Sequence, residues 1–146
     1  CSIFDMKLPE ILNQNVPISK WCGCGTNMVS YTTDGISYPC HTFQPNTSGC
    51  NELVNIDFDS INDFNDIECR SCLIERICSN CYGLNLNERN NILSRDKRMC
   101  GIHKVRALAT SMLLSEQIES GIKDFDPNEL YQIIEAIELI QSELTI

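Results

Sequence analysis

The sequence predicts an α+β fold in which a small β-hairpin and cysteine-rich loops precede two C-terminal α-helices. Three observations support this fold: a short alternating segment with a turn in its middle, two stretches with helical periodicity near the C-terminus, and ten cysteines among 146 residues. A chain of this length has the size of one domain and is long enough to bury a hydrophobic core.

Residues 1–20 are expected to form a connector from an upstream domain that this chain lacks. Apolar residues occur there without a sustained period, and Pro9 and Pro17 interrupt any long helix. No basic stretch precedes an apolar run, so the segment does not resemble a secretory signal. No stretch approaches the roughly 20 apolar residues of a membrane-spanning helix. We therefore expect a cytoplasmic piece of a longer protein.

Residues 27–38 show the alternation of a β-hairpin. Polar and apolar side chains alternate from Asn27 to Thr32, and Thr33-Asp34-Gly35 supplies a turn before Ile36-Ser37-Tyr38. Gly35 is placed to adopt the positive φ that such a turn requires. The hairpin should end at Pro39-Cys40.

The stretch from residue 44 to residue 95 is expected to be irregular. Residues 44–66 are rich in Asn, Asp and Ser, with room for one short helical turn after Asp59. Residues 67–83 hold four cysteines, and residues 84–95 continue as a polar, Asn-rich loop. Because apolar side chains are few here, ligation of a metal or cluster should order these loops.

Two amphipathic helices should close the chain. The first is expected from about Asp96 to Gly121, and the second opens with Asp126-Pro127-Asn128-Glu129, a sequence typical of a capped helix start. Both apolar stripes should face the core or a partner helix. The stripe positions are Met99, Ile102, Val105, Leu108, Ala109, Met112 and Leu113 in the first helix, and Leu130, Ile133, Ile134, Ile137, Ile140 and Leu144 in the second.

The formal net charge of −9 disfavours nucleic acid and anionic membranes as partners, because both are bound through basic surface. Several basic residues gather around Cys100, where they either offset the charge of a ligated centre or form a solvated helix face. They are Arg95, Lys97, Arg98, Lys104 and Arg106.

Eight of the ten cysteines fall into two groups. The first surrounds the predicted hairpin, and the second is a compact run followed by one outlying cysteine. Such a density of thiolates is typical of zinc sites and iron–sulfur clusters. A disulfide framework is disfavoured, because cysteines two residues apart rarely pair and no signal peptide points to an oxidising compartment. The groups are Cys22, Cys24 and Cys40, and then Cys69, Cys72, Cys78, Cys81 and Cys100.

Zinc is one interpretation of this pattern, since paired CxxC units are common zinc ligands. The pairs Cys69/Cys72 and Cys78/Cys81 have only five residues between them, whereas zinc ribbons usually place roughly 15 to 20 there. Proteins with two iron–sulfur clusters often pass the last cysteine of a run to the other cluster, which suits the observed order better.

At these cysteines the sequence resembles the SPASM domain, the auxiliary-cluster region at the C-terminus of many radical SAM enzymes that modify peptides and proteins. The resemblance rests on Cys22-Gly23-Cys24-Gly25, on residues 33–41 with Gly35 and Cys40, on the four-cysteine run and on Cys100. It covers about residues 21–115, which leaves residues 116–146 as a helical extension.

The resemblance implies two four-iron four-sulfur (4Fe–4S) clusters, whose ligands we call the first set and the second set. Cys24 either completes the first set or is a thiol that points away, in which case an open iron would suit direct substrate ligation. The run has two residues before Cys81 where the family has three, which affects the geometry of the first cluster. Cys1, Cys50, His41 and His103 are not expected to be ligands. The first set is Cys22, Cys24, Cys40 and Cys81, and the second is Cys69, Cys72, Cys78 and Cys100.

The resemblance further implies that the chain is the auxiliary domain of a radical SAM enzyme that matures a ribosomal peptide or a protein. The clusters would serve electron transfer and substrate placement within an oxidoreductase reaction. The family's SAM-binding cysteine triplet is absent from this sequence, so the chain alone should be inactive. S-adenosylmethionine would enter through a catalytic domain, expected in the same polypeptide. The alternatives are a zinc-stabilised protein-interaction module and a stand-alone electron-transfer protein.

Overall fold

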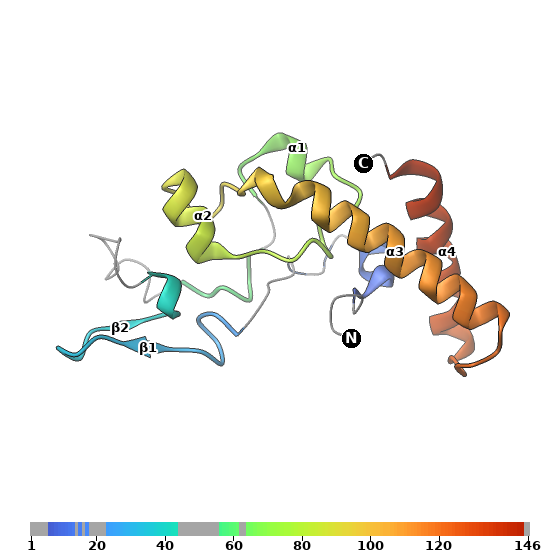
Figure 1. Ribbon diagram of the computed structural model, residues 1–146, viewed down its shortest axis with the longest axis horizontal. Coiled ribbons are helices and arrows are strands. Elements are labelled where there is room, and N and C mark those ends of the chain that lie inside the picture. Colours follow the sequence, from blue (N-terminus) through green and yellow to red (C-terminus); the bar gives the residue numbers. More distant parts are fainter. Residues whose placement is uncertain are drawn as a thin grey trace. The chain divides into compact units, whose positions relative to one another are not determined.

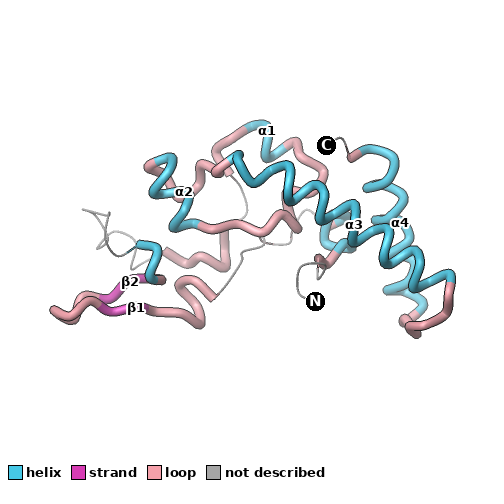
Figure 2. The backbone as a smooth tube through the Cα atoms, viewed as in Figure 1, coloured by secondary structure: helices cyan, strands magenta, loops and turns pink. Residues whose placement is uncertain are grey.

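The computed structural model describes residues 6–13, 15, 17, 23–43, 56–61 and 64–144. This part of the chain contains a two-stranded antiparallel hairpin and four α-helices, two of them C-terminal, which confirms the α+β prediction (Figure 1, Figure 2). The chain divides into two compact units. We call residues 1–16, 71–78 and 98–146 the helical unit, and residues 17–70 and 79–97 the hairpin unit. Within the described residues, no helix combines the length and apolar composition needed to cross a bilayer.

The helical unit is built on α3 (Cys100–Glu119) and α4 (Pro127–Glu143), which pack on each other and on a 3-10 helix, Leu8–Leu12. Leu8 and Ile11 are buried in the same apolar cluster as α4, so residues of the predicted connector belong to this core. The capped start of α4 is confirmed, because the Asp126 carboxylate accepts hydrogen bonds from the backbone N–H groups of Asn128 and Glu129. The stripe on α4 is largely confirmed. Its buried residues are Ile133, Ala136, Ile137 and Ile140.

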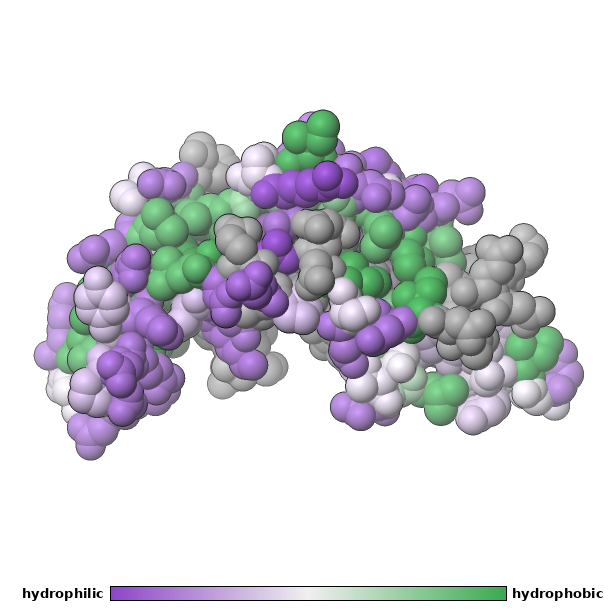
Figure 3. Space-filling view, turned by 180° about the vertical axis from the view of Figure 1, so that it is seen from behind, coloured by the Kyte–Doolittle hydropathy of each residue, from purple (hydrophilic) through white to green (hydrophobic). Residues whose placement is uncertain are grey.

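No residue of the stripe predicted for α3 is fully buried, so its placement in the core is wrong, whereas its role as a face for a partner helix stays a prediction. Ile102 and Met112 are 53% and 61% exposed, whereas Ala107, Thr110 and Ser111 are buried. The Thr110 and Ser111 hydroxyls donate to backbone carbonyls of the preceding turn, at 2.8 and 2.7 Å, so burial leaves these hydroxyls satisfied. The buried face of α3 therefore carries small side chains together with His103. Hydrophobic residues also reach the surface on the face seen in Figure 3.

The ends of α3 lie close to the prediction. A 3-10 turn, Lys97–Met99, precedes the helix, so α3 starts at Cys100 instead of Asp96. Gly121 has a φ of 63°, the left-handed conformation expected just beyond a helix end.

The hairpin is confirmed with its turn. Strands β1 (Ser30–Tyr31) and β2 (Ser37–Tyr38) pair antiparallel, with Ser30 opposite Tyr38. Gly35 has a φ of 86°, and its backbone N–H donates to the Thr32 carbonyl at 3.0 Å. The Thr32 N–H in turn donates to the Ile36 carbonyl at 2.9 Å, which closes the turn.

Two short helices occupy the stretch predicted to be irregular, and that prediction is wrong there. They are α1 (Ile67–Arg70) and α2 (Tyr82–Arg89). In α2, Tyr82, Gly83 and Asn85 are buried, which gives one packed face over little more than two turns. The helix ends at Asn90 in the left-handed conformation, with a φ of 53°. The Asn-rich composition that suggested a loop therefore includes a buried residue and a C-cap.

Asn85 holds the residues after α2 against the helix. Its side-chain oxygen accepts from the Asp96 backbone N–H at 3.0 Å. Its amide donates to the Ile92 carbonyl and to the Asn80 side-chain oxygen, both at 2.9 Å. All three contacts belong to a side chain that is 2% exposed, so Asn85 is a fully bonded polar group inside the hairpin unit.

We expect Gly25→Ala to destabilise the hairpin unit. Gly25 has a φ of 70°, and an added Cβ would overlap the buried ring of Phe58. The backbone strain and the clash together should lower the free energy of unfolding by about 2 kcal/mol. Denaturant titration measures this loss. Gly101→Ala is the control, because a Cβ on this residue of α3 meets open space and should be neutral or slightly stabilising.

Candidate metal centre

The seven cysteines that the structure describes carry thiols rather than disulfides. The two compact units divide the four-cysteine run, because Cys69 and Cys81 belong to the hairpin unit and Cys72 and Cys78 to the helical unit. Cys1, Cys22 and Cys50 lie outside the described residues. Three of the four members of the first set are therefore described, and all three belong to the hairpin unit. They are Cys24, Cys40 and Cys81.

Cys24 and Cys40 lie in one apolar cluster of the hairpin unit, and each is at most 4% exposed. A backbone hydrogen bond from the Gly25 N–H to the Pro39 carbonyl, at 3.1 Å, joins the two segments that carry them. Gly25 follows Cys24 and Pro39 precedes Cys40. The hairpin thus brings two predicted ligands, sixteen positions apart in the chain, into one buried neighbourhood.

Cys81 is the N-cap residue of α2, in extended conformation, and its carbonyl accepts from the Asn85 N–H at 3.0 Å. The next residue, Tyr82, lies in the same apolar cluster as Cys24 and Cys40. Cys69, on α1, also lies in this cluster and is 7% exposed. The resemblance to the SPASM domain implies that Cys69 belongs to the second set, but Cys69 lies in the same apolar cluster as Cys24 and Cys40 of the first set.

Three members of the second set belong to the helical unit. Cys78 and, in part, Cys72 are buried in its core beside Ile74 and Ile77. The turn between them is held by backbone hydrogen bonds from Glu75 to Cys72 and from Cys78 to Ile74, at 3.0 and 2.8 Å. Cys100 is the first residue of α3. Ligation through all four members remains a prediction.

In the part of the chain that the structure describes, no three Cys, His, Asp or Glu side chains are close enough together to hold a metal ion. Metal binding commonly supplies the energy that draws ligands into place, because thiolates repel one another without a cation. What the hairpin unit shows is a buried neighbourhood of thiols. Convergence of its cysteines on a metal is a prediction for the loaded protein.

Two buried polar groups flank Cys81. The Asn80 side-chain nitrogen and the Tyr82 hydroxyl are both inaccessible to water and have no hydrogen-bond partner among the described residues. Asn80 and Tyr82 are 3% and 1% exposed, and buried polar groups are normally bonded. The Asn80 side chain is close enough to lower the pKa of Tyr82, but the two groups do not reach hydrogen-bond geometry.

The pKa of Tyr82 is raised from its usual 10.0 to about 12, chiefly by burial; Asn80 and Arg95 lower it, and nearby Cys24 and Asp59 contribute smaller increases. The ring packs on Phe58, with 5.2 Å between ring centroids. The hydroxyl therefore stays protonated over the whole physiological range and keeps a proton to donate.

The raised pKa of Tyr82 predicts a loss of stability in alkali for the metal-free protein. Between pH 10 and pH 12 the folded chain keeps a proton that the unfolded chain releases, so the free energy of unfolding falls as pH rises. The loss should reach roughly 2 to 3 kcal/mol. Tyr82→Phe removes this titration, so denaturant titrations of both proteins at pH 9 and pH 12 should differ in slope with pH. Equal losses in the two proteins would show that Tyr82 does not cause the effect.

Two of the basic residues predicted to gather around Cys100, Arg95 and Lys97, have partners within the hairpin unit. Lys97 belongs to the hairpin unit, contacts the Glu68 carboxylate of α1 and lies 3.7 Å from Asp66. The hydrogen bond to Glu68 raises the pKa of Lys97. Arg95 is buried, with its guanidinium 4.5 Å from the centre of the Phe64 ring. The hairpin unit therefore carries a buried cation near Tyr82, which suits an anionic centre.

The described residues line a cavity in each of the two units. A cavity of about 370 Å³ in the hairpin unit is lined by Gly25, Met28, Tyr38, Pro39 and Phe58, among other uncharged residues. Its wall thus includes the direct neighbours of Cys24 and Cys40. This cavity could not be predicted from the sequence, because it depends on Phe58, which lies in the stretch predicted to be irregular.

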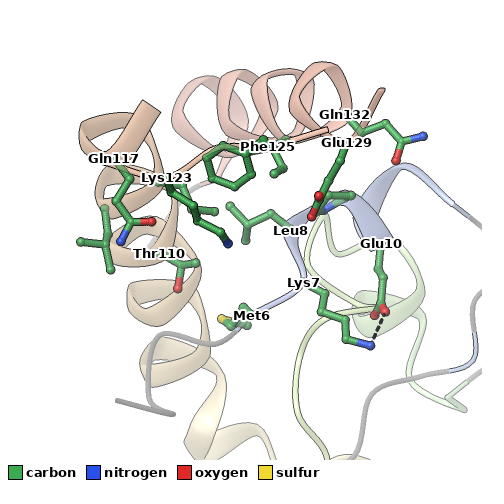
Figure 4. Close-up of a pocket in the computed structure, with 14 residues that line it drawn as sticks. Met6, Lys7, Leu8, Glu10, Thr110, Gln117, Lys123, Phe125, Glu129 and Gln132 are labelled. Atoms are coloured by element: carbon green, nitrogen blue, oxygen red, sulfur yellow. Dashed lines mark ion pairs between the residues drawn. The ribbon is translucent and has the colours of Figure 1, made fainter. Parts of the chain in front are cut away.

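A larger cavity, of about 750 Å³, lies in the helical unit (Figure 4). Leu8 and Phe125 turn toward the same space, and Lys7 forms an ion pair with Glu10 at 3.5 Å on one side. Lys123 lies over the Phe125 ring at 4.6 Å. The lining mixes both charge signs with apolar side chains and contains no cysteine, so this cavity is separate from the candidate metal ligands.

Comparisons of the chain with protein-family models, with curated proteins and with solved structures found no match.

Proposed function

We propose that the chain is an auxiliary iron–sulfur domain of a radical SAM enzyme that modifies a ribosomal peptide or a protein. The observation that carries this proposal is the buried neighbourhood of the hairpin unit. Cys24 and Cys40 lie in one apolar cluster with Tyr82, and Cys81 is the residue before Tyr82. Soft thiolates in apolar surroundings, beside unsatisfied donors, are the environment of an iron–sulfur cluster.

The proposed first cluster would be held by Cys22, Cys24, Cys40 and Cys81. When bound, a 4Fe–4S cluster supplies a one-electron carrier to the enzyme. Phe43, Phe58 and Tyr82 would exclude water from it, because all three are at most 2% exposed in the same cluster of side chains. Low solvent exposure and a fixed protein environment are two of the factors that set its reduction potential.

The second task in this proposal is substrate placement. The cavity beside Gly25 and Pro39 has no charged side chain in its lining, in a chain whose net charge is −9. Met28 and Val29 at this cavity are 37% and 55% exposed. An uncharged, apolar part of a peptide substrate would fit these surfaces next to the residues that carry Cys24 and Cys40.

The catalytic partner in this proposal is a SAM-binding domain, because the chain lacks the cysteine triplet for that chemistry. The chain by itself would accept and release electrons without cleaving S-adenosylmethionine. The competing proposal is a zinc-stabilised interaction module, which would use the same thiolates.

Visible spectroscopy after anaerobic reconstitution with iron and sulfide tests the proposal. We expect a brown protein whose broad absorption weakens when dithionite is added, because iron–sulfur clusters accept electrons. Zinc has no accessible redox step, so a folded, colourless protein that binds zinc and shows no reducible absorption would contradict the proposal and favour the interaction module.

A further inference from the structure

The hydrogen bonds around Asn85 determine which atom of Asn80 is left unpaired. The Asp96 backbone N–H can only donate, so the Asn85 atom it meets is the oxygen. The other Asn85 atom is therefore the amide nitrogen, which also suits its contact with the Ile92 carbonyl. That nitrogen donates to Asn80, so the Asn80 atom it meets is the oxygen. The unpaired Asn80 atom is thus an NH₂ group, a donor.

The two unpaired groups beside Cys81 then have the same requirement. Asn80 offers two N–H donors and Tyr82 offers an O–H donor, and both are shielded from water. An unsatisfied buried donor is costly, so a partner for these groups is expected in the working protein. That partner must be an acceptor, and the described residues do not supply one.

The predicted cluster ligands would bring sulfur acceptors into this neighbourhood. Cys81 lies between Asn80 and Tyr82 in the chain, and Cys24 and Cys40 lie in the same buried apolar cluster as Tyr82. Thiolate and sulfide sulfurs of a bound cluster accept hydrogen bonds, and such bonds are among the terms that set cluster potentials.

We propose that the Tyr82 hydroxyl donates a hydrogen bond to a sulfur of the first cluster and raises the reduction potential of that cluster. This inference rests on the proposed function, since it requires a cluster at the first set. The bond strengthens when the cluster is reduced, because the added electron makes the sulfurs more negative. Tyr82 is then a positioning and tuning residue rather than a ligand.

Redox titration of the reconstituted protein, followed by visible absorption, tests this role of Tyr82. The reduction wave that disappears in Cys40→Ala identifies the first cluster. Tyr82→Phe should keep full iron content and shift that wave to lower potential. A bond that favours the reduced state about tenfold corresponds to about 59 mV for one electron. Tyr31→Phe is the matched control, because it removes the same hydroxyl from a residue that is 64% exposed, and it should leave the potential unchanged.

The two proposals fail in different ways in this experiment. If Tyr82→Phe keeps its iron and its potential equals that of the unaltered protein, the Tyr82 bond is overturned while the cluster stands. If the unaltered protein shows no reducible centre at all, the proposed function fails and the Tyr82 bond fails with it. A shift of similar size in Tyr31→Phe would also overturn the assignment to Tyr82, since the effect would then not depend on the buried hydroxyl.

Discussion

Replacing Cys40 with alanine is expected to reduce the iron content of the reconstituted chain from about eight to about four atoms. Cys40 is 3% exposed, lies in the apolar cluster with Cys24 and Tyr82, and belongs to the first set. A 4Fe–4S cluster that loses one of its cysteine ligands in a buried site should be lost or strongly weakened. Iron and sulfide analysis after anaerobic reconstitution measures the change.

Cys50→Ala is the matched control for this experiment, since Cys50 belongs to neither set and should leave iron and sulfide unchanged. Cys69→Ala adds a second comparison. Cys69 lies in the apolar cluster of Cys24 and Cys40, although the resemblance to the SPASM domain implies that it belongs to the second set. Loss of the same reduction wave in Cys69→Ala and Cys40→Ala would reassign Cys69 to the first cluster. Full iron in Cys40→Ala would contradict the first set.

Asn85→Ala should strongly destabilise the hairpin unit. The change removes the hydrogen-bond partner of the Asp96 N–H, the Ile92 carbonyl and the Asn80 side-chain oxygen. Water does not readily replace this partner, because the Asn85 side chain is only 2% exposed. Because each unsatisfied buried group costs about 1 to 3 kcal/mol, the free energy of unfolding should fall by roughly 3 to 4 kcal/mol. Denaturant titration of the metal-free protein measures this difference.

Asn87→Ala is the control on the same helix. Asn87 is exposed and donates one long hydrogen bond, 3.3 Å, to the Thr42 carbonyl, so its loss should change stability by less than about 0.5 kcal/mol. If the two variants lose equal stability, the network around Asn85 does not hold the segment after α2 in place.

Local signals allowed several elements to be predicted from the sequence. The turn glycine at Gly35, the capped start at Asp126-Pro127 and the glycine beyond α3 each have a direct conformational cause, and the structure has all three where expected. These features depend on a few neighbouring residues. Their local conformation can therefore be predicted without knowledge of the tertiary contacts.

The features that failed depend on contacts between distant segments. Helix α2 forms because Tyr82 and Asn85 are buried against other parts of the hairpin unit, which an Asn-rich composition does not reveal. The buried face of α3 carries Ala107, Thr110 and Ser111, because hydroxyls bonded within the helix are buried at little cost. Hydropathy alone therefore did not identify the face of α3 that is buried in the core.

The candidate site was predicted only as a set of cysteines. Pattern and resemblance identified Cys24, Cys40 and Cys81 as members of one set, and the structure places all three in the hairpin unit. The unpaired donors of Asn80 and Tyr82 could not be predicted, since their state depends on the bonds of Asn85 and on burial. Cys69 lies in the same apolar cluster as Cys24 and Cys40, and the spacing of the cysteines in the sequence could not predict this either.

The most direct test of the account is the iron, sulfide and zinc content of the full chain, purified and reconstituted without oxygen. Two 4Fe–4S clusters predict about eight irons and eight sulfides per chain with little zinc. Stoichiometric zinc with no sulfide, in a protein that stays folded, would contradict the central claim and identify the cysteines as ligands of a structural metal.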